Sequence, residues 1–271
     1  MEQHETTESL IDGLRSGDVE IRKQAIERAV HSTDDEIVDR LVQLVQEPDI
    51  GQDSRDAAAV TLAQMPSGRG GTFLLELINS DDPVLRGLAA VGLGHLQTGA
   101  SMSALIQALA DKVNTVRNLA ERGLLSMIDV VRDNGVEQLL ELLNHPVPLT
   151  RSPTARVLGL TRDPRALDPL LQILRSDRQW LARLWAAKGL GDLAMAEAFD
   201  ALAATMQSDE RNRVRAAAAE AIGKLRMPKS NELLQKALKD EDGGVRRVAE
   251  EAIDALHQTG FEQDHDPFAE V

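Results

Sequence analysis

Eight arginines recur along this sequence at nearly even intervals. Neighbouring members of the series are 31 to 34 residues apart. The arginines are Arg22, Arg55, Arg86, Arg117, Arg151, Arg183, Arg215 and Arg246. Aspartates such as Asp111, Asp177 and Asp209 stand in the polar segments before them. Because a ligand site would not need eight copies, the spacing predicts structural anchors of a repeat.

Three basic residues form the strongest candidate for a binding site. Five positions after the anchors of three successive repeats stand Arg122, Arg156 and Lys188, whereas other repeats have apolar or acidic residues there. Packed helices are about 10 Å apart, so these side chains would form a basic ladder. Trp180, which we expect to be exposed in a turn, would flank the last rung, because Trp and Arg are frequent binding anchors. The alternative is that the basic residues form a solvated surface and that Trp185 packs in the core between repeats.

The sequence contains no motif for catalysis or metal binding. Its six histidines show no zinc-binding spacing, and it has no cysteine. It has neither a Gly-x-Ser-x-Gly nucleophile elbow nor a Gly-x-x-x-x-Gly-Lys phosphate loop. Paired catalytic carboxylates cannot be distinguished from a solvated acidic surface. The sequence therefore predicts no metal and no cofactor, and it does not favour an enzyme that acts through its own residues.

Pairs of helices must position these residues. An apolar helical segment and a polar turn come before each anchor. The residues three and seven positions after it are almost always Ala, Leu or Ile, and these positions lie on one face of a helix. One helical hairpin of about 30 residues cannot bury both of its faces, so successive hairpins must stack. The pattern predicts an all-α fold, a right-handed α-solenoid of about eight helical hairpins.

Two local features are also expected in some of the second helices. A glycine eight positions after the anchor is expected near the helix end, as a small contact residue or a C-cap. These glycines are Gly94, Gly159, Gly191 and Gly223. In the fifth repeat, Ser152 is expected to be the N-cap and Pro153 the first helical residue, which would leave Arg151 in the turn.

The residues around the anchors resemble those of a known repeat family. Residues 214–223, VRAAAAEAIG, and residues 85–94, LRGLAAVGLG, are similar to HEAT repeats of the phycobilisome-lyase type. The resemblance covers roughly residues 8–257 and implies ladders of turn aspartates and helix arginines between neighbouring repeats. It also implies a lyase-like role on a phycobiliprotein as one option. Deoxyhypusine hydroxylase, a related helical-repeat enzyme family, holds two irons through several His-Glu pairs, but His4-Glu5 is the only such dipeptide here.

The composition indicates the domain boundaries and the cellular location. Residues 1–7 are polar and acidic, so we expect a flexible tail and no signal peptide. Residues 8–257 are expected to form the repeat solenoid, and residues 258–271 an acidic, disordered C-terminal tail. No apolar run approaches the roughly 18 residues that a membrane-spanning helix needs. We therefore expect a cytoplasmic protein with no membrane partner.

The charge distribution limits the classes of ligand that the protein is expected to bind. A net charge of −14 argues against general nucleic-acid binding, which requires a broad basic surface. The mildly basic middle of the chain permits a local site for an anion or an acidic peptide. The sequence therefore favours a non-enzymatic protein–protein interaction scaffold or adaptor that binds an acidic or extended segment of another protein through the concave groove of the solenoid. The alternative is a phycobilin lyase-like or chromophore-handling subunit. The oligomeric state is left open.

Overall fold

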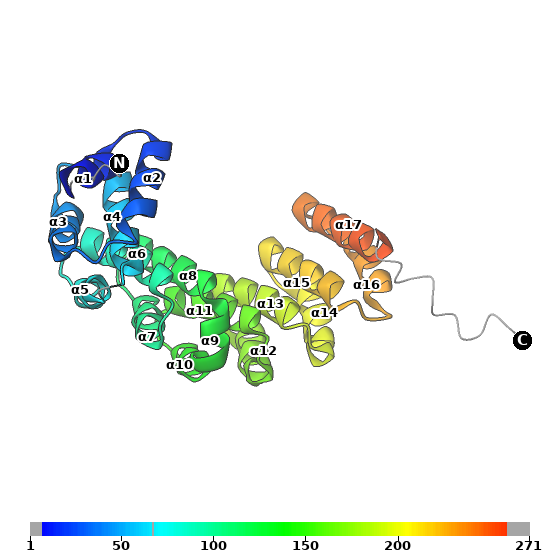
Figure 1. Ribbon diagram of the computed structural model, residues 1–271. Helices are drawn as coiled ribbons and strands as arrows, with labels where there is room; N and C mark the ends of the chain where they lie inside the picture. The colour runs from blue at the N-terminus through cyan, green and yellow to red at the C-terminus, as the bar shows by residue number, and fades with distance from the viewer. Residues whose placement is uncertain (1–6, 67, 259–271) are drawn as a thin grey trace, which may run out of the picture. The chain divides into compact units, whose positions relative to one another are not determined.

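The protein is helical throughout its described residues. The computed structural model describes residues 7–66 and 68–258, and these ranges contain seventeen α-helices, two short 3-10 helices and no strand (Figure 1). None of the helices in the two ranges is long and apolar enough to cross a membrane. The all-α prediction is thus confirmed. Packing divides the chain into an N-terminal unit, Met1–Gln138, and a C-terminal unit, Leu139–Val271. The two tails predicted at residues 1–7 and 258–271 lie outside the described residues except for Thr7 and Gln258, which belong to helices.

Two classes of helix alternate along the chain. The first helices, which precede the anchors, are α1 (Thr7–Arg15), α3 (Asp35–Gln46), α5 (Arg69–Leu77), α7 (Gly99–Ala108), α10 (Val136–Leu142), α12 (Leu167–Ser176), α14 (Phe199–Ser208) and α16 (Ser230–Ala237). The second helices, which contain the anchors, are α2 (Val19–Ala29), α4 (Gln52–Gln64), α6 (Pro83–Leu96), α8 (Asn114–Ser126), α11 (Pro148–Thr161), α13 (Trp180–Leu193), α15 (Asn212–Leu225) and α17 (Gly243–Gln258). The remaining helical segments are α9 (Ile128–Asn134), η1 (Pro164–Ala166) and η2 (Ala196–Ala198). Every anchor arginine is the fourth residue of its second helix, so the anchors share one structural position.

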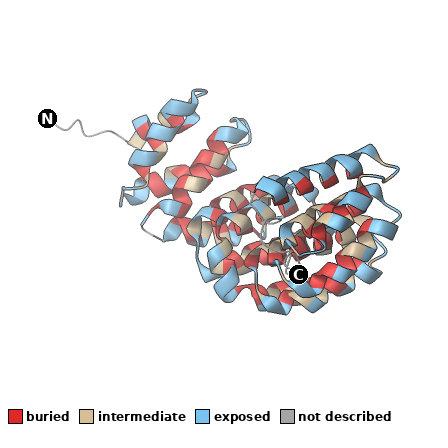
Figure 2. Cartoon of the chain, turned by 90° about the vertical axis from the view of Figure 1, so that its right-hand side faces the viewer, coloured by how far each residue is buried: buried red, intermediate tan, exposed pale blue. Residues whose placement is uncertain are grey.

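The periodic small and apolar positions of the second helices are buried, as predicted. The residues three positions after the anchors are at most 5% exposed, and they are Ala25, Ala58, Ala89, Ala120, Thr154, Ala186, Ala218 and Ala249. The residues seven positions after the anchors are at most 6% exposed, and they are Ala29, Leu62, Leu93, Leu124, Leu158, Leu190, Ile222 and Ile253. Figure 2 shows buried residues on the inward sides of the helices and exposed residues on their outward sides. This buried stripe fixes which face of each second helix remains available for binding.

The glycines eight positions after the anchors are contact residues and not C-caps. Each lies inside its helix, which continues for two residues beyond it. A Cβ atom on Gly94 would lie 2.7 Å from the Cα atom of Gly123 in α8, and one on Gly191 would lie 2.8 Å from the Cα atom of Ala221 in α15. The C-caps of these four helices have φ angles between 49° and 57°, and they are Gln97, Arg162, Ala194 and Arg226. The C-cap expectation is therefore wrong, and only the close-contact expectation is confirmed.

The second helix of the fifth repeat begins earlier than predicted. Helix α11 starts at Pro148, directly after the N-cap residue Val147, so Arg151 lies in the helix and not in a turn. Ser152 is not the N-cap, because its hydroxyl group donates a hydrogen bond to the carbonyl oxygen of Pro148 at 3.1 Å within the helix. Pro153 also lies inside α11. The earlier proline sets the start because a proline at the first helical position loses no intrahelical hydrogen bond.

Candidate functional site

The anchor arginines hold the turn of their own repeat. In seven of the eight, Nη1 donates to the main-chain carbonyl oxygen six residues earlier, at 2.6–3.0 Å. We call that earlier residue the turn position. Its side chain accepts a hydrogen bond from the main-chain N–H two residues later, and the residues that do so are Ser16, Ser80, Asp111, His145, Asp177, Asp209 and Asp240. The turn position therefore closes the turn whether it carries Ser, His or Asp.

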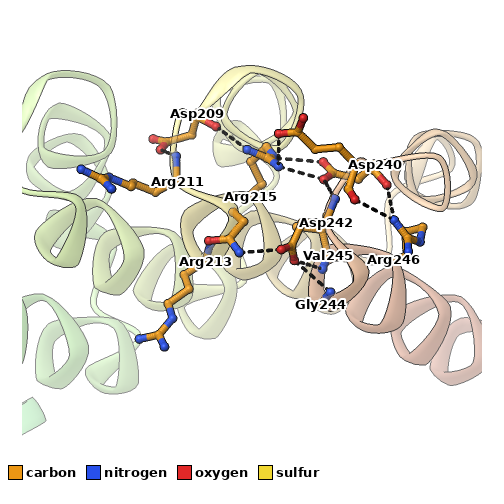
Figure 3. Close-up of polar contacts among 11 residues, drawn as sticks. Asp209, Arg211, Arg213, Arg215, Asp240, Asp242, Gly244, Val245 and Arg246 are labelled. Carbon is orange, nitrogen blue, oxygen red and sulfur yellow. Dashed lines mark hydrogen bonds and ion pairs between the residues drawn. The ribbon is translucent and has the colours of Figure 1, made fainter.

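In the C-terminal unit, an aspartate at the turn position also binds the anchor of the preceding repeat. Nε and Nη2 of the anchor donate to the two carboxylate oxygens at 2.7–3.0 Å. The pairs are Arg151–Asp177, Arg183–Asp209 and Arg215–Asp240. Each of these side chains is at most 15% exposed. Figure 3 shows the last pair, with both dashed lines running from Arg215 to Asp240. Such bidentate pairs fix the geometry of neighbouring repeats, and we call this series the ladder.

Among its described residues, the N-terminal unit contains one pair of this kind. Arg86 donates from Nε and Nη2 to Asp111 at 2.6 and 3.0 Å. Arg22 instead donates from Nη2 alone to Asp53 at 3.0 Å, and the side chain of Asp53 is 77% exposed. An exposed ion pair with one hydrogen bond contributes roughly 0–1 kcal/mol, so this contact holds the repeats less firmly.

Two anchors of the N-terminal unit have no aspartate at the following turn position. Arg55 is followed by Ser80, and its Nε donates to the carbonyl oxygen of Val45 at 3.1 Å. Arg117 is followed by His145 in the sequence, and its Nη2 donates to the Oδ1 atom of Asn114 in its own helix at 3.1 Å. At these two anchors, the lack of an aspartate at the turn position accompanies the lack of a bidentate pair. Arg22 differs from them, because Asp49 stands six residues before Arg55 and yet Arg22 pairs with Asp53.

Arginine anchors lower the pKa of three aspartates, Asp111, Asp177 and Asp240. Burial opposes ionisation of Asp177, but hydrogen bonds from Arg151 and a main-chain N–H outweigh it, so the pKa of Asp177 lies below its ordinary value. The pKa of Asp111 is lowered in the same way, with burial outweighed by Arg86. The hydrogen bond from Arg215 is the main cause of the lowered pKa of Asp240. These groups are therefore anionic at neutral pH and serve structure rather than proton transfer.

Beside the ladder, two of the predicted basic residues lie around a tryptophan. The guanidinium carbon of Arg156 in α11 lies 4.9 Å from the ring centre of Trp185 in α13, and Nζ of Lys188 lies 5.9 Å from it. Nζ of Lys188 also forms an ion pair with Glu220 in α15 at 2.7 Å. We call Arg156, Trp185, Lys188 and Glu220 the aromatic–basic face. Trp185 is partly exposed, so the prediction that it packs in the core is wrong.

The acidic member of this face is shared between two lysines. Glu220 accepts from Lys188 at 2.7 Å and pairs with Lys224 at 3.0 Å, and Lys224 also contacts Asp192 in α13 at 2.8 Å. Burial opposes ionisation of Glu220, but the two lysines outweigh it, so its pKa is lowered. Burial likewise opposes the charge on Lys224, but hydrogen bonds from Lys224 to Asp192 and Glu220 raise its pKa. The face is therefore a network of paired charges rather than the continuous basic ladder predicted from the sequence.

The other two predicted site residues, Arg122 and Trp180, make different contacts. Arg122 is an exposed residue of α8 in the N-terminal unit, where its charge acts on Asp56 of α4. The pKa of Asp56 is raised by burial, and the nearby Arg122 partly offsets this. Trp180 is the first residue of α13 and not part of a turn, and the guanidinium carbon of Arg213 lies 5.8 Å from its ring centre. Among the predicted site residues, the structure thus brings together Arg156 and Lys188.

Residue spacing could have revealed one member of the aromatic–basic face, Glu220, that the sequence analysis did not propose as a site residue. Glu220 stands at the same repeat position as Lys188, 32 residues later, so an ion pair between neighbouring helices could have been expected. The two arginine–tryptophan contacts depend on side-chain conformation and leave no spacing signal. In the described part of the chain, no group of three or more His, Cys, Asp or Glu side chains could hold a metal ion. The arrangement offers cation, aromatic and carboxylate groups for recognition.

Comparison with known proteins finds HEAT repeats in the second half of the chain. A family model described as HEAT repeats matches residues 129–188 and 167–254. No curated protein matches the sequence. The structure of the CpcE–CpcF complex of phycocyanin lyase from Nostoc sp. PCC7120 is similar, with a TM-score of 0.51 and 25% identity over 57% of this chain and 99% of that chain. The Escherichia coli protein YIBA_ECOLI has a TM-score of 0.51, 18% identity and 93% coverage of both chains. Importin beta has a TM-score of 0.58 and 14% identity over 91% of this chain and 38% of its own.

Proposed function

We propose that this protein is a cytoplasmic, non-enzymatic scaffold that binds another protein. The match of residues 129–188 and 167–254 to HEAT repeats and the likeness to CpcE–CpcF support this proposal. The binding site is the aromatic–basic face of the second helices in the C-terminal unit. The observation that carries the proposal is the partly exposed ring of Trp185, with Arg156 of one helix and Lys188 of its own helix beside it. Tryptophan and arginine are the side chains most often found as anchors at protein interfaces.

The charge network suits an acidic, extended partner segment. The side chains of Lys188 and Glu220 are 32% and 35% exposed, so water screens their ion pair and little free energy holds it together. A carboxylate of the partner can therefore replace Glu220 as the partner of Lys188 at small cost. The stem of Arg156 and the ring of Trp185 offer apolar area for the backbone and apolar side chains of the same segment. The ladder supports this face by holding the helices that carry it in fixed register.

Partner binding by charge-reversed variants tests this proposal. A partner is first isolated from the source cell by crosslinking to the intact protein, and its affinity is then measured for Arg156→Glu, Lys188→Glu and the double variant. We expect the double variant to bind at least about tenfold more weakly, because two cations that contact the partner become repulsive. Lys236→Glu, on the first helix α16, is the matched control and should bind normally.

Arg122→Glu provides a separate comparison, because Arg122 belongs to the N-terminal unit. Weaker binding by this variant would extend the site into that unit, in line with the ladder of three basic residues expected from the sequence. Unchanged affinity of the Arg156→Glu/Lys188→Glu variant would contradict the proposal.

A second candidate is a lyase-like or chromophore-handling subunit. It is supported by the likeness to CpcE–CpcF, since the matched region spans almost the whole length of that chain at 25% identity. The test is to mix the protein with a free linear tetrapyrrole, and then with a bilin-bearing phycobiliprotein, and to record absorbance spectra. A shifted or transferred bilin absorbance would favour this candidate over a scaffold without chromophore chemistry. Unchanged spectra in both mixtures would rule against it.

A further inference from the structure

The large apolar side chains that are exposed lie where second helices begin. In residues 7–66 and 68–258 these are Val19, Ile21, Val84, Val147 and Leu149. All five lie within four residues before an anchor arginine, where the second helices begin. In the C-terminal unit, Val147 and Leu149 are 45% and 49% exposed. Burying such side chains against a partner is favourable, so clustering at helix starts marks a docking surface better than scattered exposure does.

The ladder aligns these helix starts in the C-terminal unit. The bidentate pair of Arg151 with Asp177 places the start of α11 beside the turn that leads into α13. The pair of Arg183 with Asp209 does the same for α13 and the turn before α15. The contact of Trp180 with Arg213, 5.8 Å from ring centre to guanidinium carbon, joins the starts of α13 and α15 directly. These contacts therefore hold the starts of α11, α13 and α15 next to one another.

The exposed residues at these helix starts are basic as well as apolar. Arg178, Arg211 and Arg213 are exposed around Trp180, and Figure 3 shows the side chains of Arg211 and Arg213 pointing away from the Arg215–Asp240 pair. The nearby aspartates of the ladder are already bound by buried arginines. Two acids remain nearby: Glu210, 3.5 Å from Arg211 and 72% exposed, and Asp242, which accepts a hydrogen bond from Asn212 at 2.7 Å. Three arginines against these two acids leave a positive local charge on a chain whose net charge is −14.

We propose that Val147, Leu149, Arg178, Trp180, Arg211 and Arg213, here called the edge strip, form a docking site for an extended acidic peptide segment that also carries apolar side chains. The three arginines match its carboxylates, and the two aliphatic residues with Trp180 match its apolar side chains. The acidic remainder of the protein repels a long polyphosphate chain or an anionic membrane, whereas a short peptide contacts the strip alone. This site is separate from the aromatic–basic face, so it does not depend on the function proposed above.

The test uses a defined probe and the full chain. The probe is a fluorescein-labelled synthetic peptide in which glutamates alternate with leucines and phenylalanines, and binding is followed by fluorescence anisotropy. Two control peptides replace either all glutamates by lysine or all apolar residues by alanine. We expect the acidic apolar peptide to bind in the micromolar range and both controls to bind at least about tenfold more weakly. Single-stranded DNA and phosphatidylserine vesicles are tested in parallel, and we expect neither to compete.

Variants locate the site on the protein. Arg178→Glu/Arg213→Glu and, separately, Val147→Ser/Leu149→Ser should each weaken peptide binding at least about tenfold. Circular dichroism confirms that each variant is folded, and the two pairs provide independent evidence because their charge changes differ. Lys236→Glu should bind normally. The proposal is overturned if both double variants bind the peptide as tightly as the native chain does. It is also overturned if the native chain does not bind the acidic apolar peptide. Loss of binding with Lys188→Glu alone would move the site to the aromatic–basic face, and tighter binding of DNA or vesicles would replace the peptide by that class of ligand.

Discussion

The two units of this protein use the same anchor arginines in different ways. In the C-terminal unit, three successive anchors each bind a nearly buried aspartate of the next repeat through two hydrogen bonds. In the N-terminal unit, Arg86 alone does so, while Arg22 makes one contact with an exposed aspartate. For Arg55 and Arg117 the difference lies in the turn position that follows, which carries Ser80 or His145. For Arg22 that position carries Asp49, and the anchor contacts Asp53 instead. In the ladder, an aspartate at the turn position serves its own turn and the preceding repeat at once, whereas a serine serves only its own turn.

The largest expected effect is the loss of a ladder aspartate. Asp177→Ala would remove both hydrogen bonds to Arg151 and the one from the N–H of Gln179, and it would leave a largely buried guanidinium unpaired. We expect the free energy of unfolding, measured by urea denaturation, to fall by about 2–4 kcal/mol. Asp53→Ala in the N-terminal unit is the matched control, and its expected loss is about 0–1 kcal/mol because Asp53 is exposed. Equal losses would show that the bidentate ladder has no special stabilising role.

Close helix packing gives the next largest effect. A Cβ atom on Gly159 of α11 would clash with the main chain of Gly189 in α13, and main-chain atoms cannot rotate away. We expect Gly159→Ala to lower the free energy of unfolding by about 1–3 kcal/mol. The corresponding Gly94→Ala in the N-terminal unit should be similarly harmful, since its Cβ atom would lie 2.7 Å from the Cα atom of Gly123. Gly99→Ala, which has open space around it, should be neutral or slightly stabilising, and a loss there equal to that of Gly159→Ala would contradict the packing argument.

A gain of about 1 kcal/mol is expected from extending the ladder into the N-terminal unit. Ser80→Asp would place a carboxylate at the turn position that follows Arg55, while keeping an acceptor for the N–H of Asp82. A new charge-assisted hydrogen bond to the buried Arg55 should raise the urea midpoint. Asn79→Asp adds the same charge one residue earlier and should not stabilise the protein. If Ser80→Asp is no more stable than Asn79→Asp, the turn position does not decide ladder formation.

The smallest expected effect is a change in how the free energy of unfolding depends on pH in acid. Asp177 and Asp240 have lowered pKa values in the folded chain, and an unfolded aspartate titrates at about 3.9. The lowered pKa stabilises the folded state above that value, and this contribution is lost as pH falls through the lower folded value. The free energy of unfolding should therefore decrease more steeply below pH about 4 in the native chain than in Asp177→Asn, which has one fewer titrating group. The same acid dependence in both proteins would show that Asp177 does not contribute.

Much of the fold could be predicted because burial follows a simple period. The positions three and seven residues after each anchor are chemically uniform, and all of them are buried as expected. Helix ends were harder to predict, since single residues signal them ambiguously. Pro148 and Pro153 could each begin α11, and the glycine at position 159 could equally be a cap or a contact. Packing against the neighbouring repeat selects between such alternatives, and a single sequence does not show that packing.

The candidate site was predicted only in part, for a related reason. Trp185 stands two residues after its anchor, at the border of the buried stripe, so sequence alignment of the repeats placed it in the core. A long aromatic side chain at such a border can leave its ring accessible, and here it meets Arg156. The basic character of Arg156 and Lys188 was visible in the sequence. Their neutralising partners, including Glu220, became clear only when the faces of adjacent helices were placed together.

Amide hydrogen exchange at the turns tests the central claim, that aspartate at the turn position ties neighbouring repeats together, most directly. The N–H groups of Gln179 and Arg211 donate to ladder aspartates at 2.9 Å, and those of Asp18 and Asp82 donate to serines at 3.1 and 3.2 Å in equivalent turns. The account predicts markedly slower exchange at Gln179 and Arg211, because opening those turns must also break a bidentate pair with the preceding repeat. Equal exchange at all four sites, or slower exchange at the serine turns, would contradict it.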